Sequence, residues 1–218
     1  MNRAFIFDMD GVLIDSERAW EGKELQLLEN MFGAEFAKSL GETIIGTSIT
    51  DTYERAVGLG ISVSHEEFLR RYDETAKDVL SQSEITNGTN ELIERLGSLN
   101  YKIGLVSSSR KNWIDQILLR LPFRDAFGVV ISLTDTPRLK RKPHPDGYFE
   151  AMRVLDADPA RSIVLEDSNP GIQSAKTSGA YVIGFRGNLV PGYEQTGADA
   201  YADTMSDVIA LVEKFIQQ

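Results

Sequence analysis

Residues 3–11 read "RAFIFDMDG", and two aspartates follow an apolar run at this point of the chain. The run 3–8 is short and continuously apolar, which is typical of a strand buried on both faces. Such strands form parallel sheets covered by helices, and the ligands of these sheets bind beyond the carboxyl ends of the strands. Asp8 and Asp10 therefore lie where a ligand site is expected, although two neighbouring carboxylates repel each other.

Four further apolar runs have the same strand-like character. They span residues 102–108, 128–133, 162–167 and 180–185. Amphipathic segments with helical spacing alternate with them, at 89–100, 111–121, 145–155 and 169–179. Pro170 in a first turn and Gly179 just past an end are typical helix start and stop signals. This alternation predicts an α/β fold with a doubly wound parallel sheet.

The segment 16–85 breaks the alternation. It contains helical patterns at 16–32, 51–60 and 64–82, with no convincing buried strand between them. We therefore expect a core made of 1–15 and 86–218, with 16–85 as an inserted helical unit. Because the insertion leaves directly after the acidic loop, we expect it to act as a lid, or cap, over the end of the first strand. A helical subdomain that only adds bulk is the alternative.

Composition narrows the class of protein. The chain has no cysteine, which excludes disulfides and thiolate-bound zinc. We expect no signal peptide, because no basic leader precedes the first strand, and no apolar run approaches the ~18 residues that span a bilayer. The net charge of −10 disfavours nucleic acid and anionic membranes as partners, and the basic run 138–144 is short and lacks aromatic residues. We expect a cytoplasmic protein that is a monomer or weak dimer.

The residues after each expected strand suggest a site. The groups are Asp8-Met9-Asp10-Gly11, Ser107-Ser108-Ser109-Arg110 and Glu166-Asp167, with Lys142-Pro143-His144 before a helix. The carboxyl ends of parallel strands meet at one edge, so these acids, hydroxyls and cation are expected to converge there. Four carboxylates at one edge repel each other strongly. A hard divalent cation with oxygen ligands, such as Mg²⁺, offsets this repulsion.

This set of side chains is suited to phosphoryl transfer. Gly11 allows a sharp turn and a close approach to a ligand. Ser107 can donate to a phosphoryl oxygen, and Ser109 and Arg110 can assist from a helix N-terminus, which attracts anions. Lys142 can balance a developing negative charge. A carboxylate held by a metal and a lysine can act as a nucleophile, and a second one nearby as general acid and base.

Other sites do not match the spacing. An EF-hand loop starting at Asp8 would have Val12, Leu13 and Ala19 where an acidic residue or Asn, a Gly and a Glu are required. The sequence has no G-x-x-x-x-G-K-[ST], G-x-G-x-x-G or G-x-S-x-G motif. His65 and His144 are too far apart in sequence to suggest a zinc pair. For His144, a solvated position and a contact with substrate both stay open.

Four segments, in this order, resemble the motifs of the haloacid dehalogenase-like hydrolase superfamily. They are "DMDGVLIDSE" (8–17), the serine at 107 in "LVSSSR" (105–110), "KPHPDGY" (142–148) and "LEDSNPGI" (165–172). The chain is most similar to the branch with a small helical cap, which contains β-phosphoglucomutases, phosphoglycolate phosphatases and sugar-phosphate phosphatases. The resemblance covers all but the last thirty or so residues. It implies a Rossmann-like core with a small all-helical cap.

The resemblance also implies roles for individual residues. Asp8 would be the nucleophile, Asp10 the general acid and base, and Ser107 and Lys142 catalytic partners. Around Mg²⁺ it implies the side chains of Asp8, Glu166 and Asp167 and the backbone carbonyl of Asp10. Further substrate contacts would come from Gly11, Ser108, Ser109 and Arg110.

The activity implied by the resemblance is that of a Mg²⁺-dependent phosphatase acting through an aspartyl-phosphate. Its substrate would be a small phosphorylated metabolite of the sugar phosphate or phosphoglycolate type. Asp10 disfavours dehalogenation, because the dehalogenases of the superfamily lack this aspartate. The alternative is a β-phosphoglucomutase or another hexose-phosphate mutase. Those mutases carry a histidine about where Trp20 stands and an arginine in the loop corresponding to 44–52, which has no cation here. A third possibility is a phosphometabolite-binding protein without activity.

Overall fold

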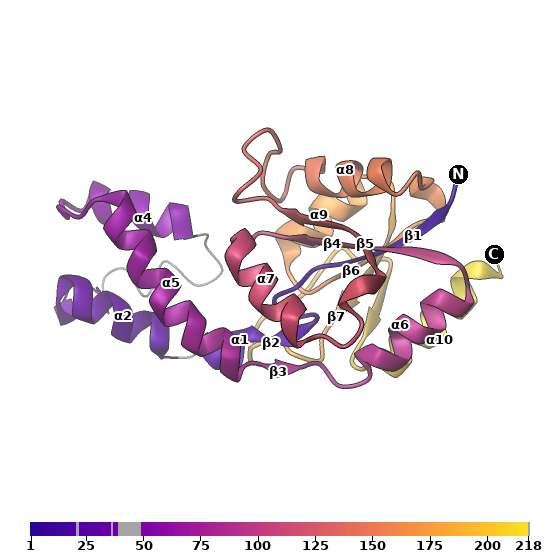
Figure 1. Ribbon diagram of the computed structural model, residues 1–218, viewed down its shortest axis with the longest axis horizontal. Helices are drawn as coiled ribbons and strands as arrows, with labels where there is room; N and C mark the ends of the chain where they lie inside the picture. Colours follow the sequence, from indigo (N-terminus) through magenta and orange to yellow (C-terminus); the bar gives the residue numbers. More distant parts are fainter. Residues whose placement is uncertain (21, 36, 39–48, 218) are drawn as a thin grey trace. The chain divides into compact units, whose positions relative to one another are not determined.

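The computed structural model describes residues 1–20, 22–35, 37–38 and 49–217 (Figure 1). The chain divides into two compact units. One, the core unit, comprises Met1–Arg18 and Ser83–Gln218, and the other, the helical unit, comprises Ala19–Gln82. Over the described ranges, no helix has both the length and the apolar character needed to cross a membrane.

The core unit contains a six-stranded sheet. Its strands are β1 (Arg3–Phe7), β4 (Tyr101–Ser107), β5 (Phe127–Ser132), β6 (Ile163–Glu166), β7 (Tyr181–Phe185) and β8 (Ala200–Ala202). They pair in the order β5-β4-β1-β6-β7-β8, and every pair is parallel. The chain builds the sheet outward from β1 on one side and then returns to β6 on the other side of β1. The predicted doubly wound parallel sheet is therefore confirmed, and its switch point lies between β1 and β6.

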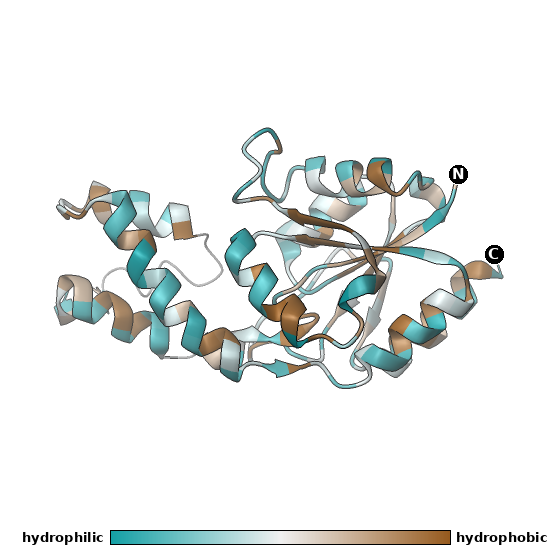
Figure 2. Ribbon diagram, viewed as in Figure 1, coloured by the Kyte–Doolittle hydropathy of each residue, from teal (hydrophilic) through white to brown (hydrophobic). Residues whose placement is uncertain are grey.

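Helices cover both faces of this sheet. They are α6 (Thr89–Ser98), α7 (Lys111–Arg120), α8 (Asp146–Val154), α9 (Asn169–Thr177) and α10 (Met205–Ile216), with short 3-10 turns η1 (Arg124–Ala126) and η2 (Pro159–Arg161). In Figure 1, α8 and α9 lie above the sheet, and α6 and α10 lie below it. The strands are the most apolar segments of the core unit (Figure 2). Every residue of β6 is buried, as the continuous apolar run predicted.

Three strands and one helix were not predicted. β2 (Ile14–Asp15) and β3 (Glu84–Ile85) form an antiparallel pair. Two residues are too few to show an alternating pattern, and β3, which follows the last helix of the segment 16–85, has no buried residue. β8 is short and only partly buried. α10 starts with a capping box, in which Thr204 and Asp207 bond each other's backbone amides, a signal present in the sequence but not used.

The helical unit contains the helices expected from the sequence. α1 (Ser16–Trp20) enters it, and α2 (Lys23–Phe32), α4 (Ile49–Gly58) and α5 (His65–Gln82) pack together. The expected continuous helix over 16–32 is divided, because Gly22 takes a left-handed conformation before α2. Phe68 of α5 is fully buried, and its ring lies 6.3 Å from that of Phe32 and 5.2 Å from that of Tyr53. Aromatic packing around α5 thus holds the unit together.

Glu24 of α2 has an unfavourable position for a charge. The Tyr72 hydroxyl donates to its carboxylate over 2.9 Å, but burial raises the pKa of Glu24 above its usual 4.5. Because the pKa of Glu24 is higher in the folded protein than in the unfolded chain, the protein loses stability as pH rises from about 4.5 through the raised pKa. Glu24→Gln keeps the acceptor and removes the charge, so we expect a thermal midpoint about 2–4 °C higher at pH 7 and little difference at pH 4.

Circular dichroism melts of the wild type and of Glu24→Gln at pH 7 and pH 4 test this expectation. Glu29→Gln, on an exposed position of the same helix, controls for the loss of one negative charge. A Glu24→Gln midpoint that does not exceed that of Glu29→Gln at pH 7 would show that the buried carboxylate carries no such cost.

Candidate active site

The carboxyl ends of three adjacent strands bring predicted site residues together. Asp8 directly follows β1, Ser107 ends β4 and Glu166 ends β6. The three side chains are almost wholly buried, with Asp8 5 % exposed and the other two 0 %. Since β1 lies between β4 and β6, these residues meet at the switch point of the sheet, the place where open α/β sheets bind ligands.

Lys142 connects two of these strand ends. Its ammonium lies 2.5 Å from Asp8 Oδ1 and also donates to Glu166 Oε1. The Lys142 side chain is only 7 % exposed. Burial opposes its charge, but the two carboxylates outweigh that effect and raise the pKa of Lys142 above its usual value. The lysine is therefore a fixed positive charge beside the expected nucleophile.

The positive charge of Lys142 is not sufficient to keep the buried Asp8 carboxylate ionised at neutral pH. Burial raises its pKa to about 8, and Lys142, which acts in the opposite direction, does not overcome this. Glu166 and Asp10 raise the pKa further by repulsion. A nucleophilic carboxylate has to be ionised, and a divalent cation beside Asp8 would lower its pKa.

Oxygen donors for such a cation lie at the turn that follows Asp8. Gly11 has a φ of +69°, and a Cβ at this position would lie 2.0 Å from Asp167 Oδ2. Asp167 thus reaches the turn that follows β1, where the Asp10 carbonyl also lies. Within the described residues, no three carboxylate or imidazole side chains form a metal site by themselves. The donor set of carboxylates and a carbonyl fits Mg²⁺, which commonly binds one or two carboxylates and keeps waters.

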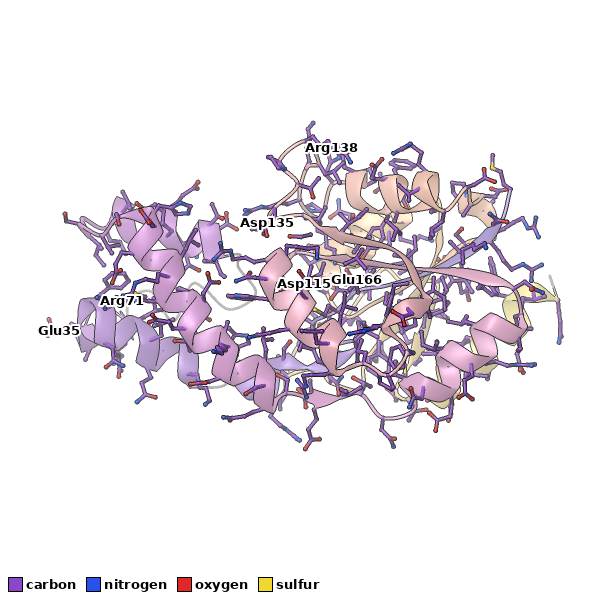
Figure 3. All side chains as sticks on the ribbon, in the orientation of Figure 1. Glu35, Arg71, Asp115, Asp135, Arg138 and Glu166 are labelled. Atoms are coloured by element: carbon purple, nitrogen blue, oxygen red, sulfur yellow. The ribbon has the colours of Figure 1, made fainter. Side chains whose placement is uncertain are left out.

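Glu166 is expected from the sequence to bind the metal, but in the structure its carboxylate is bonded to protein groups. Its Oε1 accepts hydrogen bonds from Lys142 and from the Tyr148 hydroxyl, the latter over 2.7 Å. Its Oε2 accepts from the backbone amide and the hydroxyl of Ser168, over 3.1 Å and 3.0 Å. Glu166, labelled in Figure 3, is therefore saturated by protein donors, and its role as a ligand stays a prediction.

Asp10 is held by Ser107, the last residue of β4, and by Ser109 just beyond it. Its Oδ2 accepts from the Ser109 hydroxyl over 2.6 Å and from the Ser107 hydroxyl over 3.4 Å. The Ser109 amide donates in turn to Ser107 Oγ over 2.9 Å. The serines expected to contact substrate thus also orient the expected general acid and base. Their contact with a substrate stays a prediction, as does that of Ser108 and Arg110.

The start of α7 differs from the expected open anion site. The backbone amide of Lys111 donates to Asp135 Oδ2 over 2.6 Å. That amide is therefore not free for a phosphate, because a carboxylate from the loop after β5 already occupies it (Figure 3 labels Asp135). The same loop fixes the backbone before α7, since the hydroxyls of Thr134 and Ser132 donate to the carbonyls of Ser108 and Ser109.

His144 lies at the surface beside Lys142. Its Nδ1 is 2.8 Å from Asp146 Oδ1, and its side chain is 44 % exposed. Of the two possibilities left open by the sequence, this pairing favours a solvated position.

A loop between β7 and β8, spanning 186–199, supports the acidic turns and was missed by the sequence reasoning. Gln195 is buried and donates to the carbonyls of Asp167 and Phe185 over 2.7 Å and 3.1 Å. Asn188 donates to the Gly11 carbonyl over 3.2 Å. No motif marks these residues. The available signal was a polar loop that follows a buried strand at the carboxyl edge of the sheet.

The fold and the site together define a class of enzyme, in which carboxylates and a lysine gather at the switch point of a Rossmann-like sheet. A sequence model described as haloacid dehalogenase-like hydrolase matches residues 5–185, and the chain belongs to this family. The resemblance inferred from the four motifs is thereby confirmed.

Individual relatives include enzymes with different activities. The chain is 28 % identical to Beta-phosphoglucomutase of Bacillus subtilis, over 94 % of this chain and 91 % of that protein. It is 30 % identical to Phosphorylated carbohydrates phosphatase of Thermotoga maritima, over 81 % of each protein. The crystal structure of a conserved haloacid dehalogenase-like protein from Agrobacterium tumefaciens has a TM-score of 0.77 at 24 % identity, covering 99 % of this chain and 100 % of that one. This last likeness shows a shared fold.

Proposed function

We propose that this enzyme is a Mg²⁺-dependent phosphatase that acts on a small phosphorylated metabolite, of the sugar phosphate or phosphoglycolate type, through an aspartyl-phosphate at Asp8. The observation that carries the proposal is the buried ammonium of Lys142, 2.5 Å from Asp8 at the end of β1. A carboxylate beside a fixed positive charge can approach an anionic phosphoryl group with less repulsion. The relative that acts as a phosphorylated carbohydrates phosphatase supports the substrate class.

The residues divide the reaction between them. Asp8 attacks the phosphorus while the bond to the leaving oxygen breaks, and Asp10 gives that oxygen a proton. Asp10 then takes a proton from the water that attacks the phosphorus, and the Asp8 carboxylate is released. Lys142 offsets the negative charge in both steps, and Ser107 and Ser109 orient Asp10.

The cofactor and the helical unit complete the proposal. Mg²⁺ would be held by Asp8, Asp167 and the Asp10 carbonyl, and when bound it offsets negative charge on the phosphoryl oxygens. The helical unit would act as a cap that limits water and selects the leaving group. Its boundaries would be close to the expected 16–85, as the compact unit Ala19–Gln82 suggests.

The second candidate is a hexose-phosphate mutase, favoured by the identity to the Bacillus subtilis mutase along most of the chain. A mutase has to hold the second phosphate of a bisphosphate intermediate. Trp20, whose ring lies 6.3 Å from that of Tyr72, stands about where the mutases carry a histidine. The segment 44–52 lacks the arginine of the mutases, and 44–48 lies outside the described residues. Hydrolysis is therefore the better-supported activity.

A phosphate-release screen with added Mg²⁺ tests the proposal. The panel comprises sugar phosphates, phosphoglycolate, nucleotides and pyrophosphate, with a chelator as control. β-Glucose 1-phosphate with a bisphosphate primer separates the two candidates, because a phosphatase accumulates free phosphate and a mutase accumulates glucose 6-phosphate. Ligand binding without any release across the panel would indicate the non-catalytic alternative.

The apparent affinity for Mg²⁺ should depend on pH. Because the pKa of Asp8 is raised to about 8 in the metal-free protein, Mg²⁺ must displace a proton below that pH. For the same reason, the metal-free protein loses stability as pH rises from about 4 to 8, and bound metal restores it. We expect the half-saturating Mg²⁺ concentration to rise at least about tenfold between pH 8 and pH 6. Phosphate release titrated with Mg²⁺ measures it, and an unchanged concentration would contradict the assignment of Asp8 as a ligand.

A further inference from the structure

Tyr148 of α8 contacts Glu166 and Lys142, the ion pair that lies beside the proposed nucleophile Asp8. Its side chain is fully buried. Its hydroxyl donates to Glu166 Oε1 over 2.7 Å, the same oxygen that accepts from Lys142. The centre of its ring lies 5.4 Å from the Lys142 ammonium, within the range of a cation–π contact. One aromatic residue thus limits the position of the carboxylate and of the ammonium.

Glu166 has little freedom of its own. It is 0 % exposed, and Ser168 holds its other oxygen through two hydrogen bonds. A Cβ at Gly171 would lie 1.9 Å from Glu166 Oε1, so the chain packs directly against this carboxylate. Lys142, in contrast, has a flexible side chain with three donors and no acceptor. The position of its ammonium is therefore set by the carboxylates that it meets.

We propose that Tyr148 is a positioning residue, which fixes Glu166 so that Glu166 holds the Lys142 ammonium against Asp8. Without the hydroxyl, Oε1 loses one of its two donors, and only Lys142 then holds this oxygen in place. The ammonium would then no longer be held at the distance from Asp8 that phosphoryl transfer requires. The catalytic consequence rests on the proposed function, whereas the effect on Lys142 does not.

The chain supplies a matched control for removal of this hydroxyl. Tyr101 of β4 is also buried, at 6 % exposed. Its hydroxyl has no hydrogen-bond partner among the residues that the structure describes. Tyr101→Phe therefore makes the same chemical change in the same core unit without touching the site. Tyr148→Phe keeps the ring that packs beside Lys142 and removes only the donor.

Three measurements on the wild type, Tyr148→Phe and Tyr101→Phe test the proposal. They are kcat and KM for p-nitrophenyl phosphate at saturating Mg²⁺, the Kd for Mn²⁺ by electron paramagnetic resonance, and the Lys142 ammonium signal in ¹⁵N-lysine NMR spectra. For Tyr148→Phe we expect kcat to fall by about 10- to 100-fold, KM and the Mn²⁺ Kd to stay within about twofold, and the ammonium signal to shift or broaden. Tyr101→Phe should match the wild type in all three.

Two results would overturn the proposal. One is a Tyr148→Phe variant that matches Tyr101→Phe in kcat and in the ammonium signal. The other is a tenfold weaker Mn²⁺ affinity with kcat restored at saturating metal, because Glu166 would then act as a ligand. If the wild type hydrolyses no phosphate ester, the proposed function fails, but the ammonium signal still decides the structural part. A signal that moves only in Tyr148→Phe supports the positioning role, and an unmoved signal refutes it.

Discussion

Asp8→Asn should lower Mg²⁺-dependent phosphate release by at least about a thousandfold while the protein stays folded. The amide of Asn cannot form the aspartyl-phosphate, although it has nearly the same shape as the carboxylate. Folding should survive because Lys142 keeps its second partner, Glu166, and because burial makes the Asp8 carboxylate costly in the metal-free protein. Phosphate release measured with the best substrate of the screen, together with a circular dichroism melt, tests both parts.

The control for Asp8→Asn comes from the same stretch of sequence. Asp15 accepts a hydrogen bond from the Arg18 amide over 3.2 Å and lies outside the proposed machinery. Asp15→Asn should keep release within about twofold of the wild type. If Asp8→Asn retained near-normal activity, the nucleophile would have to be another residue.

Lys142→Met should destabilise the protein by about 3–5 kcal/mol, because it leaves the buried Glu166 carboxylate, and the Asp8 carboxyl group beside it, without their cation. Since the pKa of Lys142 is raised, its contribution is fully present below the usual lysine value of 10.5 and is lost only as pH rises through the folded-state pKa. Chemical denaturation at pH 7 measures the loss. Release should also fall by at least about 100-fold, because the charge on the phosphoryl group loses its fixed partner.

An exposed lysine provides the comparison for Lys142→Met. Lys111 pairs with Asp115 on the surface of α7, where its side chain is 49 % exposed. Lys111→Met should cost less than about 1 kcal/mol. If both variants lost the same stability, the buried ion pairs of Lys142 would contribute no more than the exposed pair of Lys111.

Sequence patterns were sufficient for the parts of the fold that depend on buried strands. The runs 3–8 and 162–167 are continuously apolar because β1 and β6 are covered on both faces. β8 is only partly buried, so the same signal is weak there. β2 and β3 have two residues each, and their pairing depends on where the chain enters and leaves the core unit.

The sequence predicts the site residues that lie at strand ends. It does not predict the hydrogen bonds that they make with side chains from distant segments. Asp8 and Glu166 converge because β1 and β6 are parallel and adjacent. The chemistry of Glu166, in contrast, depends on Tyr148, which the quoted motif contains but whose partner no spacing rule identifies. Asp135 likewise lies 24 residues beyond the helix amide that it caps. Such contacts arise from tertiary packing, so residue types alone do not reveal them.

In the proposed mechanism, Asp8 carries the phosphoryl group during turnover. Asp10→Asn should allow this group to accumulate from p-nitrophenyl phosphate, because a good leaving group needs no proton, whereas hydrolysis of the acyl phosphate needs the base. Mass spectrometry of the acid-quenched variant with Mg²⁺, followed by peptide mapping, measures where the group resides. We expect the added mass of one phosphoryl group on Asp8. A phosphoryl group on another residue, or none while nitrophenol is still released, would rule out Asp8 as the nucleophile.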